Sequence, residues 1–131
     1  MNIVDLGEND IDPTSYQGMV DDWAIDCFGK SVARNQEERT HRFLEEALEM
    51  AQASGCTQAD AHRLVDYVYG RETGDPAQEA GAVMLTLAAL CNAIGLDMED
   101  CAQKELSRVW DKLDAIRAKQ AAKPENSPLP E

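Results

Sequence analysis

Apolar positions recur at helical spacing along most of this chain. After Pro13-Thr14-Ser15, apolar side chains follow at i, i+3, i+4, i+7 and i+11, which predicts a first helix that ends near Gly29. The stripe consists of Tyr16, Met19, Val20, Trp23 and Cys27. Residues 31–35 are expected to form a short connection to the next helix.

Two further helices are predicted in the middle of the chain. The first covers about residues 36–54, has a broad apolar face, and ends where Gly55 can adopt a left-handed C-terminal conformation. The second starts at Thr57, with Asp60 three residues later as a variant of the capping box, and ends at Gly70. The apolar face of the first consists of Phe43, Leu44, Ala47, Leu48, Met50 and Ala51.

The last two predicted helices differ in polarity. Asp75 is a good N-cap and Pro76 a good first residue for a helix over 76–94, which is apolar nearly all round and is therefore expected to be buried on most sides. Asp97 caps the last helix, which Pro124 ends. Its seam has alternating spacings of four and three and consists of Ala102, Leu106, Val109, Leu113 and Ile116.

These elements predict an all-α fold, a helical bundle of about five helices around the apolar fourth one. No segment shows strand-like alternation, and no internal repeat is found. The expected organisation is a flexible N-terminus over residues 1–12, an all-α domain over 13–123 and a flexible tail over 124–131. Such a domain has a modest core, so completion by oligomerisation is expected.

The charge of the chain limits the kinds of partner that it is expected to bind. The net charge is −13, and half of the twelve Lys and Arg residues lie in the last 28 positions, which argues against binding to a nucleic-acid backbone. The apolar run Ala80–Ile94 is shorter than a bilayer span, so no membrane partner is expected. Residues 1–12 lack the features of a signal peptide, and the four cysteines form no CxxC pair, which favours a reduced, cytoplasmic location.

Acidic residues supply the candidate chemistry. Glu46 and Glu49 are three positions apart on one helix and point the same way, at the edge of its apolar face, with Glu45 on the solvent side. Glu79 is the only charged residue between Pro76 and Leu96, and it lies in the first helical turn. Two interpretations stay open. In the first, Glu45, Glu46 and Glu49 form a solvated helix face, and Glu79 is a favourable charge at a helix N-terminus. In the second, the acids form one divalent-cation site, whose oxygen donors favour Mg²⁺ or Mn²⁺ over zinc.

Basic residues of the last helix are a weaker candidate for substrate phosphate. Lys104, Arg108 and Lys112 are expected to form ordinary intrahelical ion pairs, and alternatively to reach a phosphate held at the carboxylates. Thr86, inside the apolar helix, is expected to hydrogen bond to its own backbone.

The carboxylate pattern resembles the all-α nucleoside-triphosphate pyrophosphohydrolases, the MazG-like and dimeric dUTPase superfamily. The resemblance covers about residues 39–119. Glu45-Glu46-Ala47-Leu48-Glu49 matches the EExxE motif of that family in full. Glu79-Ala80-Gly81-Ala82 matches its ExxD motif only at the glutamate, because Ala82 replaces the aspartate.

The resemblance implies Mg²⁺-dependent cleavage of a nucleoside triphosphate to monophosphate and pyrophosphate, in a homodimer or homotetramer. Glu46, Glu49 and Glu79 would be metal ligands, and Glu45 a catalytic base or a ligand through water. Two alternatives stay open: a degenerate relative that binds nucleotide or Mg²⁺ without hydrolysis, which Ala82 favours, and an acidic helical interaction protein, which the net charge favours.

Overall fold

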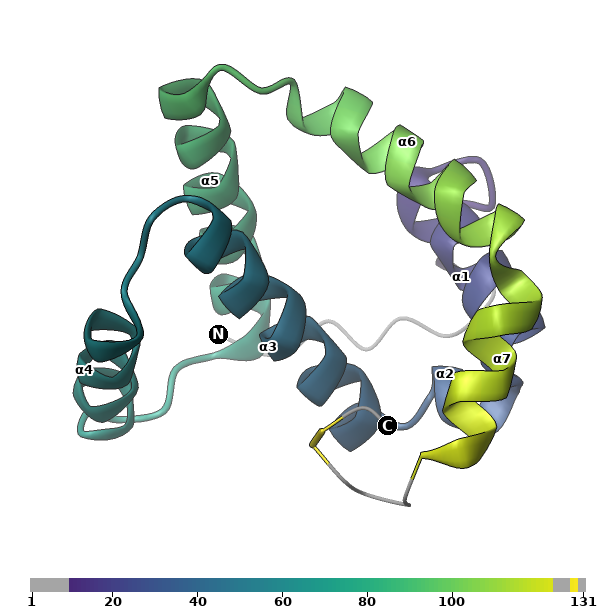
Figure 1. Ribbon diagram of the computed structural model, residues 1–131, viewed down its shortest axis with the longest axis horizontal. Coiled ribbons are helices and arrows are strands. Elements are labelled where there is room, and N and C mark those ends of the chain that lie inside the picture. Colours follow the sequence, from purple (N-terminus) through teal and green to yellow (C-terminus); the bar gives the residue numbers. More distant parts are fainter. Residues whose placement is uncertain (1–9, 124–127, 130–131) are drawn as a thin grey trace.

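The computed structural model describes residues 10–123 and 128–129 and contains, over these residues, seven helices and no strand (Figure 1). The all-α prediction is thereby confirmed. Residues 1–9, 124–127 and 130–131, which make up most of the two predicted flexible ends, lie outside the described residues. In chain order the helices are α1 (Tyr16–Phe28), α2 (Lys30–Ala33), α3 (Gln36–Ala53), α4 (Gln58–Tyr69), α5 (Pro76–Ile94), α6 (Met98–Asp111) and α7 (Leu113–Ala122).

Side-chain caps start the longer helices at the predicted places. Thr57, Asp75 and Asp97 each accept a hydrogen bond from the backbone N–H three residues later, and Pro76 follows Asp75 at the first helical position. Gly95 ends α5 in the left-handed conformation, with φ of 76°, which a residue with a Cβ rarely adopts. Local sequence signals therefore determine where these helices begin and end.

Two predicted elements differ from the structure. Most of the expected connection at residues 31–35 lies in the one-turn helix α2, because Gly29, with φ of 82°, ends α1 and lets a new turn start at Lys30. The single last helix is divided at Lys112, whose φ of −106° and ψ of 18° lie outside helical geometry. The division redirects α7 toward the start of α3.

Packing is concentrated at one end of the molecule (Figure 1). There α1 lies against α2, α6 and α7, and α2 also contacts α3. Helices α4 and α5 lie at the other end, and α3 and α6 run between the two ends. Buried apolar side chains are correspondingly few among the described residues: Ala24, Cys27, Cys91 and Leu106. Cys27 and Cys91 are free, buried thiols, and each packs as a small apolar group.

Helix α5 is the main departure from the expected burial. Within one chain it packs substantially only against α6, and Cys91 is its one buried residue. Counted from Pro76, α5 has 19 residues and is long and apolar enough to cross a membrane by length and composition alone, which the shorter run Ala80–Ile94 did not indicate. The prediction that this helix is buried on most sides is therefore wrong for a single chain.

Candidate metal site

The carboxylates nearest to a metal site lie in the middle of α3. Asn35 caps this helix by accepting a hydrogen bond from the Glu38 backbone N–H at 3.1 Å, and Glu37 and Glu38 add favourable negative charge in its first turn. Glu45 and Glu46 follow two turns later, and Glu49 one turn beyond them. Regular helical geometry thus places Glu46 and Glu49 on the same face, as the sequence predicts.

The environment of Glu46 raises the pKa of its carboxylate. Partial desolvation is the largest cause of the raised pKa, even though the residue as a whole is exposed. The negative charges of Glu49, Glu45 and Glu105 raise the pKa further. A side-chain hydrogen bond with Glu49 also stabilises the protonated form. Two carboxylates in this arrangement repel each other at neutral pH, and either a proton or a cation relieves the repulsion.

Arg42 connects Glu45 to a buried charge cluster. Arg42 Nη1 lies 3.6 Å from Glu45 Oε1, and Arg42 Nε lies 3.5 Å from Glu38 Oε1. The Glu38 carboxylate is buried and also accepts a hydrogen bond from Lys123 Nζ at the end of α7. The Arg42 guanidinium therefore connects the buried Glu38 carboxylate, in the first turn of α3, to Glu45, the first carboxylate of the candidate site.

Glu79 does not join the α3 carboxylates in this chain. It lies in the first turn of α5 and folds back over the preceding loop, where its Oε1 would lie 2.6 Å from a Cβ added to Gly74. It is absent from the carboxylates that raise the pKa of Glu46. Among the described residues, no group of three or more His, Cys, Asp or Glu side chains is arranged to hold one metal ion.

The basic residues of α6 form ion pairs within their helix. Lys104 Nζ lies 2.9 Å from Asp100 Oδ2, and Arg108 makes a bidentate pair with Glu105 at 2.7 and 2.6 Å. The intrahelical pairing was predicted, although Asp100 was not named as the partner of Lys104. Arg108 is nevertheless close enough to Glu46 for that carboxylate to contribute to the raised pKa of Arg108, after the larger effect of Glu105. Helix α6 therefore presents charged groups toward α3.

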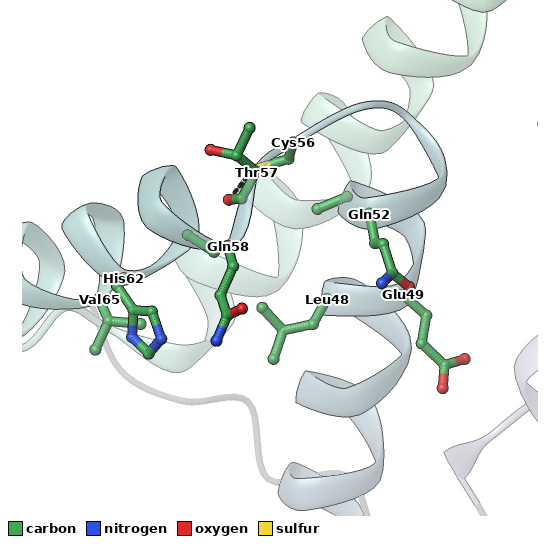
Figure 2. A pocket seen from close by; sticks show the side chains of 10 residues that line it. Leu48, Glu49, Gln52, Cys56, Thr57, Gln58, His62 and Val65 are labelled. Atoms are coloured by element: carbon green, nitrogen blue, oxygen red, sulfur yellow. Dashed lines mark hydrogen bonds between the residues drawn. The ribbon is translucent and has the colours of Figure 1, made fainter.

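A pocket of about 440 Å³ lies between α3 and α4, beside the carboxylates (Figure 2). In Figure 2 the Leu48 side chain points toward Gln58 of α4, whereas the Glu49 carboxylate points away from α4. The lining mixes apolar groups with amides and an imidazole, and its labelled members are Leu48, Glu49, Gln52, Cys56, Thr57, Gln58, His62 and Val65. Sequence reasoning did not identify this pocket, because the relative position of two helices joined by a loop is not encoded in their periodicity.

Two further sets of residues were not found from the sequence. Glu38 and Arg42 are spaced as an intrahelical pair, but Lys123 is 85 positions from Glu38, and no local signal connects them. The influence of Glu105 on Glu46 arises from the tertiary position of α6, which the sequence does not reveal. Thr86 agrees with the prediction, since its Oγ1 donates to the carbonyl oxygens of Ala82 and Val83 at 2.9 and 3.1 Å.

Comparison with protein-family models, with curated proteins and with solved structures finds no match to this chain.

Proposed function

We propose that this protein is a Mg²⁺-dependent nucleoside-triphosphate pyrophosphohydrolase that acts at the α3 carboxylates and releases a monophosphate and pyrophosphate. The observation that supports the proposal most is the Glu46–Glu49 pair, which lies on one helix face, where the negative charge of Glu49 contributes to the raised pKa of Glu46. The specific reaction is proposed from the EExxE pattern of Glu45, Glu46 and Glu49, which resembles the motif of the pyrophosphohydrolase family.

The donor set fits Mg²⁺, and Mn²⁺ would be accepted by the same atoms. Carboxylate oxygens are hard ligands, and no His or Cys lies among the three α3 acids. Mg²⁺ commonly takes only one or two protein carboxylates, keeps several waters and completes its coordination with substrate phosphates. Two carboxylates on one helix, Glu46 and Glu49, are therefore sufficient for a site that forms together with the nucleotide.

Each residue of the site has a proposed role. Glu46 and Glu49 hold the metal, and Glu45 acts as base or as a ligand through water, oriented by Arg42 at 3.6 Å. Glu79 contributes less, because its carboxylate lies over Gly74. The bound metal would neutralise phosphate charge and lower the pKa of the attacking water. Arg108 is the best placed of Lys104, Arg108 and Lys112 to contact phosphate, because of its electrostatic coupling to Glu46.

A second candidate is a non-catalytic relative that binds nucleotide and Mg²⁺ without hydrolysis. Two observations favour it: Ala82 replaces the aspartate of the second motif, and Glu79 lies apart from the α3 pair. A site with fewer carboxylates binds the metal more weakly, and it has fewer bases that can accept a proton from the attacking water. The two candidates share the site and differ in turnover.

We further propose that the protein works in the cytoplasm as a homodimer or homotetramer, with a nucleoside triphosphate as its partner and neither nucleic acid nor membrane. The four free thiols and the strongly acidic surface support this assignment.

The decisive experiment measures pyrophosphate release from a panel of nucleoside triphosphates with Mg²⁺ or Mn²⁺. We expect metal-dependent release that Glu46→Gln and Glu49→Gln abolish while helicity by circular dichroism is unchanged. Glu99→Gln on α6, which removes one exposed charge away from the site, is the matched control and should retain full activity. Normal turnover in either site variant would refute the assignment.

Calorimetry distinguishes the second candidate. Titration of Mg²⁺ in the presence of a non-hydrolysable triphosphate should give saturable binding that Glu49→Gln removes. Binding without turnover in the wild-type protein, followed by a gain of turnover in Ala82→Asp, would assign the non-catalytic role. Absence of both binding and turnover would exclude both candidates.

A further inference from the structure

Four charged side chains meet at the start of α3, in the packed end of the molecule. We call them the Glu38 cluster: Glu38, Arg39, Arg42 and Lys123. Lys123 Nζ donates a hydrogen bond to Glu38 Oε1. Arg39 Nη2 and Arg42 Nε each lie 3.5 Å from the same oxygen, which is an ion-pair distance and longer than a normal hydrogen bond. Three cations therefore surround one carboxylate oxygen.

The two arginines of the cluster carry N–H groups that lack an acceptor. Arg39 Nε, Arg39 Nη2 and Arg42 Nε are buried, and none of them has a hydrogen-bond partner among the described residues. Buried donors in folded proteins are nearly always paired, because an unpaired one loses its bonds to water and gains none. These three atoms can only donate, so the group that pairs with them must supply acceptors.

The charges of the cluster do not balance. Lys123 compensates the charge of Glu38, so the positive charges of Arg39 and Arg42 have no acid of their own within the cluster. The Pro128 carbonyl oxygen, which accepts a hydrogen bond from Arg42 Nη2, carries no net charge. Burial holds the pKa of Arg39 below its ordinary value, the Glu38 carboxylate opposes this shift, and the positive charge of Arg42 adds to it. Two neighbouring cations are thus kept together in a chain whose net charge is −13.

Two charges at the edge of the cluster offset each other. Glu45 Oε1 lies 3.6 Å from Arg42 Nη1 and adds one negative charge. Burial raises the pKa of the Cys27 thiol, and the positive charges of Arg117, on α7, and Arg39 both lower it, so Arg117 lies near the cluster and adds one positive charge. An excess of two positive charges therefore remains, which favours a ligand with two negative charges.

The position of Arg39 suits a phosphate group. Its guanidinium carbon lies 4.6 Å from the centre of the Phe28 ring, so the ring fixes the plane of the guanidinium. A guanidinium held in this way presents its N–H groups as a rigid fork that matches two oxygens of a phosphate. The side chains of Arg39 and Arg42 keep 29% and 18% of their surface exposed, so a small ion can reach them from solvent.

We propose that Arg39 and Arg42 form a binding site for a phosphate-sized oxyanion, either a free ion or the phosphate group of a small molecule. The oxyanion supplies acceptors to the unpaired N–H groups, and its charge of about −1.5 to −2 near neutral pH balances the excess. A nucleic-acid backbone is disfavoured, because its other phosphates would face a surface of strongly negative net charge. The inference does not depend on the proposed function, because the site needs neither a metal nor the α3 acids Glu46 and Glu49.

The first test is thermal unfolding of the wild-type protein in EDTA, with sodium phosphate added at constant ionic strength. EDTA removes divalent metal, so phosphate cannot bind through a metal at Glu46 and Glu49. We expect a saturable increase in Tm, of roughly 4 °C at ten times the dissociation constant, and no increase with sodium chloride. Absence of an increase would overturn the proposal. So would a linear increase without saturation, since that is the effect of an ion excluded from the protein surface.

The second test locates the site. Arg39→Gln removes one guanidinium of the site and should abolish the phosphate-dependent increase in Tm. Arg63→Gln, which removes an equal charge from α4 at a side chain that is 82% exposed, is the matched control and should retain the increase in full. Equal increases in the two variants would overturn the location.

NMR spectra of the wild-type protein provide an arm that needs no variant. Phosphate should shift the Nε–H signals of Arg39 and Arg42 and leave that of Arg63 in place, and a shift confined to Arg63 would overturn the proposal. Glycerol 3-phosphate identifies the source of the oxyanion. Tighter binding than inorganic phosphate at the same two arginines would support a phosphate group on a small molecule, whereas equal or weaker binding there would support the free ion.

Discussion

Lys123, the residue that follows the last helix, donates a hydrogen bond to the carboxylate of Glu38, which lies 85 positions earlier in the first turn of α3. Both side chains are more than nine-tenths buried, at 5% and 8% exposure. Arg39 Nη2 and Arg42 Nε each lie 3.5 Å from the same carboxylate oxygen. One buried acid thus gathers three cations and fixes the end of α7 to the start of α3.

This pair should be more important for stability than any exposed ion pair of the molecule. Lys123→Met leaves the Glu38 carboxylate buried with two weaker partners, so we expect the free energy of unfolding to fall by about 1–3 kcal/mol. Urea denaturation followed by circular dichroism measures the loss. Lys104→Met, which breaks an exposed pair with Asp100, is the control and should leave the midpoint unchanged. Equal midpoints for the two variants would contradict the assignment.

Removing both charges of the pair tests the mechanism. In the double variant Glu38→Gln with Lys123→Met, Arg39 and Arg42 lose the acid that they share, so we expect no recovery relative to Lys123→Met. The total loss should nevertheless be smaller than the sum of the losses of the two single variants, because each single variant already removes the Lys123–Glu38 interaction. Additive losses in the double variant would show that packing, rather than charge, is the main contribution.

The raised pKa of Glu46 predicts how stability depends on pH without metal. A carboxylate whose pKa is higher in the folded state binds its proton more tightly there, so the free energy of unfolding decreases as pH rises through and above its ordinary value of about 4.5. Glu46→Gln removes this penalty and should raise the urea midpoint at pH 7 but not at pH 4. Glu99→Gln is the charge-matched control. A wild-type protein that gains stability relative to Glu46→Gln with rising pH would contradict the sign.

Metal binding should stabilise the folded protein through Glu46 and Glu49. At a concentration of Mg²⁺ 100-fold above its dissociation constant, the gain is about 2.7 kcal/mol, measurable as an increase in Tm. Glu49→Gln should abolish the increase, whereas Glu79→Gln should retain most of it, because the Glu79 carboxylate lies over Gly74. Complete loss in Glu79→Gln would instead indicate that this side chain leaves Gly74 to join the α3 pair.

Among the glycines that the structure describes, Gly18 is the one at which an added Cβ would lie nearest to other backbone atoms. A Cβ at this position would lie 2.2 Å from the Asp12 carbonyl oxygen and 2.8 Å from the Pro13 Cα, and both are backbone atoms that cannot rotate away. Gly18→Ala should therefore lower the free energy of unfolding by about 1–3 kcal/mol, as overpacking does elsewhere. Gln17→Ala, at the exposed neighbouring position, is the control, and thermal unfolding is the measurement. Equal Tm values for the two variants would argue that the start of α1 rearranges.

Helix boundaries were predictable because their causes are local. Thr57, Asp75 and Asp97 cap the helices that the sequence assigns to them, and Gly95 ends α5 directly after the predicted range 76–94. The division at Lys112 was missed, since apolar spacing continues across it from Val109 to Leu113. A break in backbone direction that leaves the periodicity intact has no signature in the sequence.

The candidate site was predictable only where one helix supplies it. Helical geometry alone places Glu46 beside Glu49. The positions of Glu79 and Glu105 depend instead on how α5 and α6 lie in the fold. No sequence signal separates Glu79 from the α3 carboxylates, and none brings Glu105 near them. The burial of α5 was wrongly predicted for a related cause: apolarity shows that a helix needs a cover, not which molecule provides it.

The Lys123–Glu38 contact has a consequence for synthesis on the ribosome. Helices α1, α2 and α3 leave the exit tunnel before α7, which lies against α1 and is followed directly by Lys123, the contact partner of α3. Until α7 and Lys123 emerge, the earlier helices are without these contacts, and the packed end of the molecule is incomplete. A nascent chain stalled before Lys123 would present α1 and the apolar helices behind it to chaperones in place of a finished core.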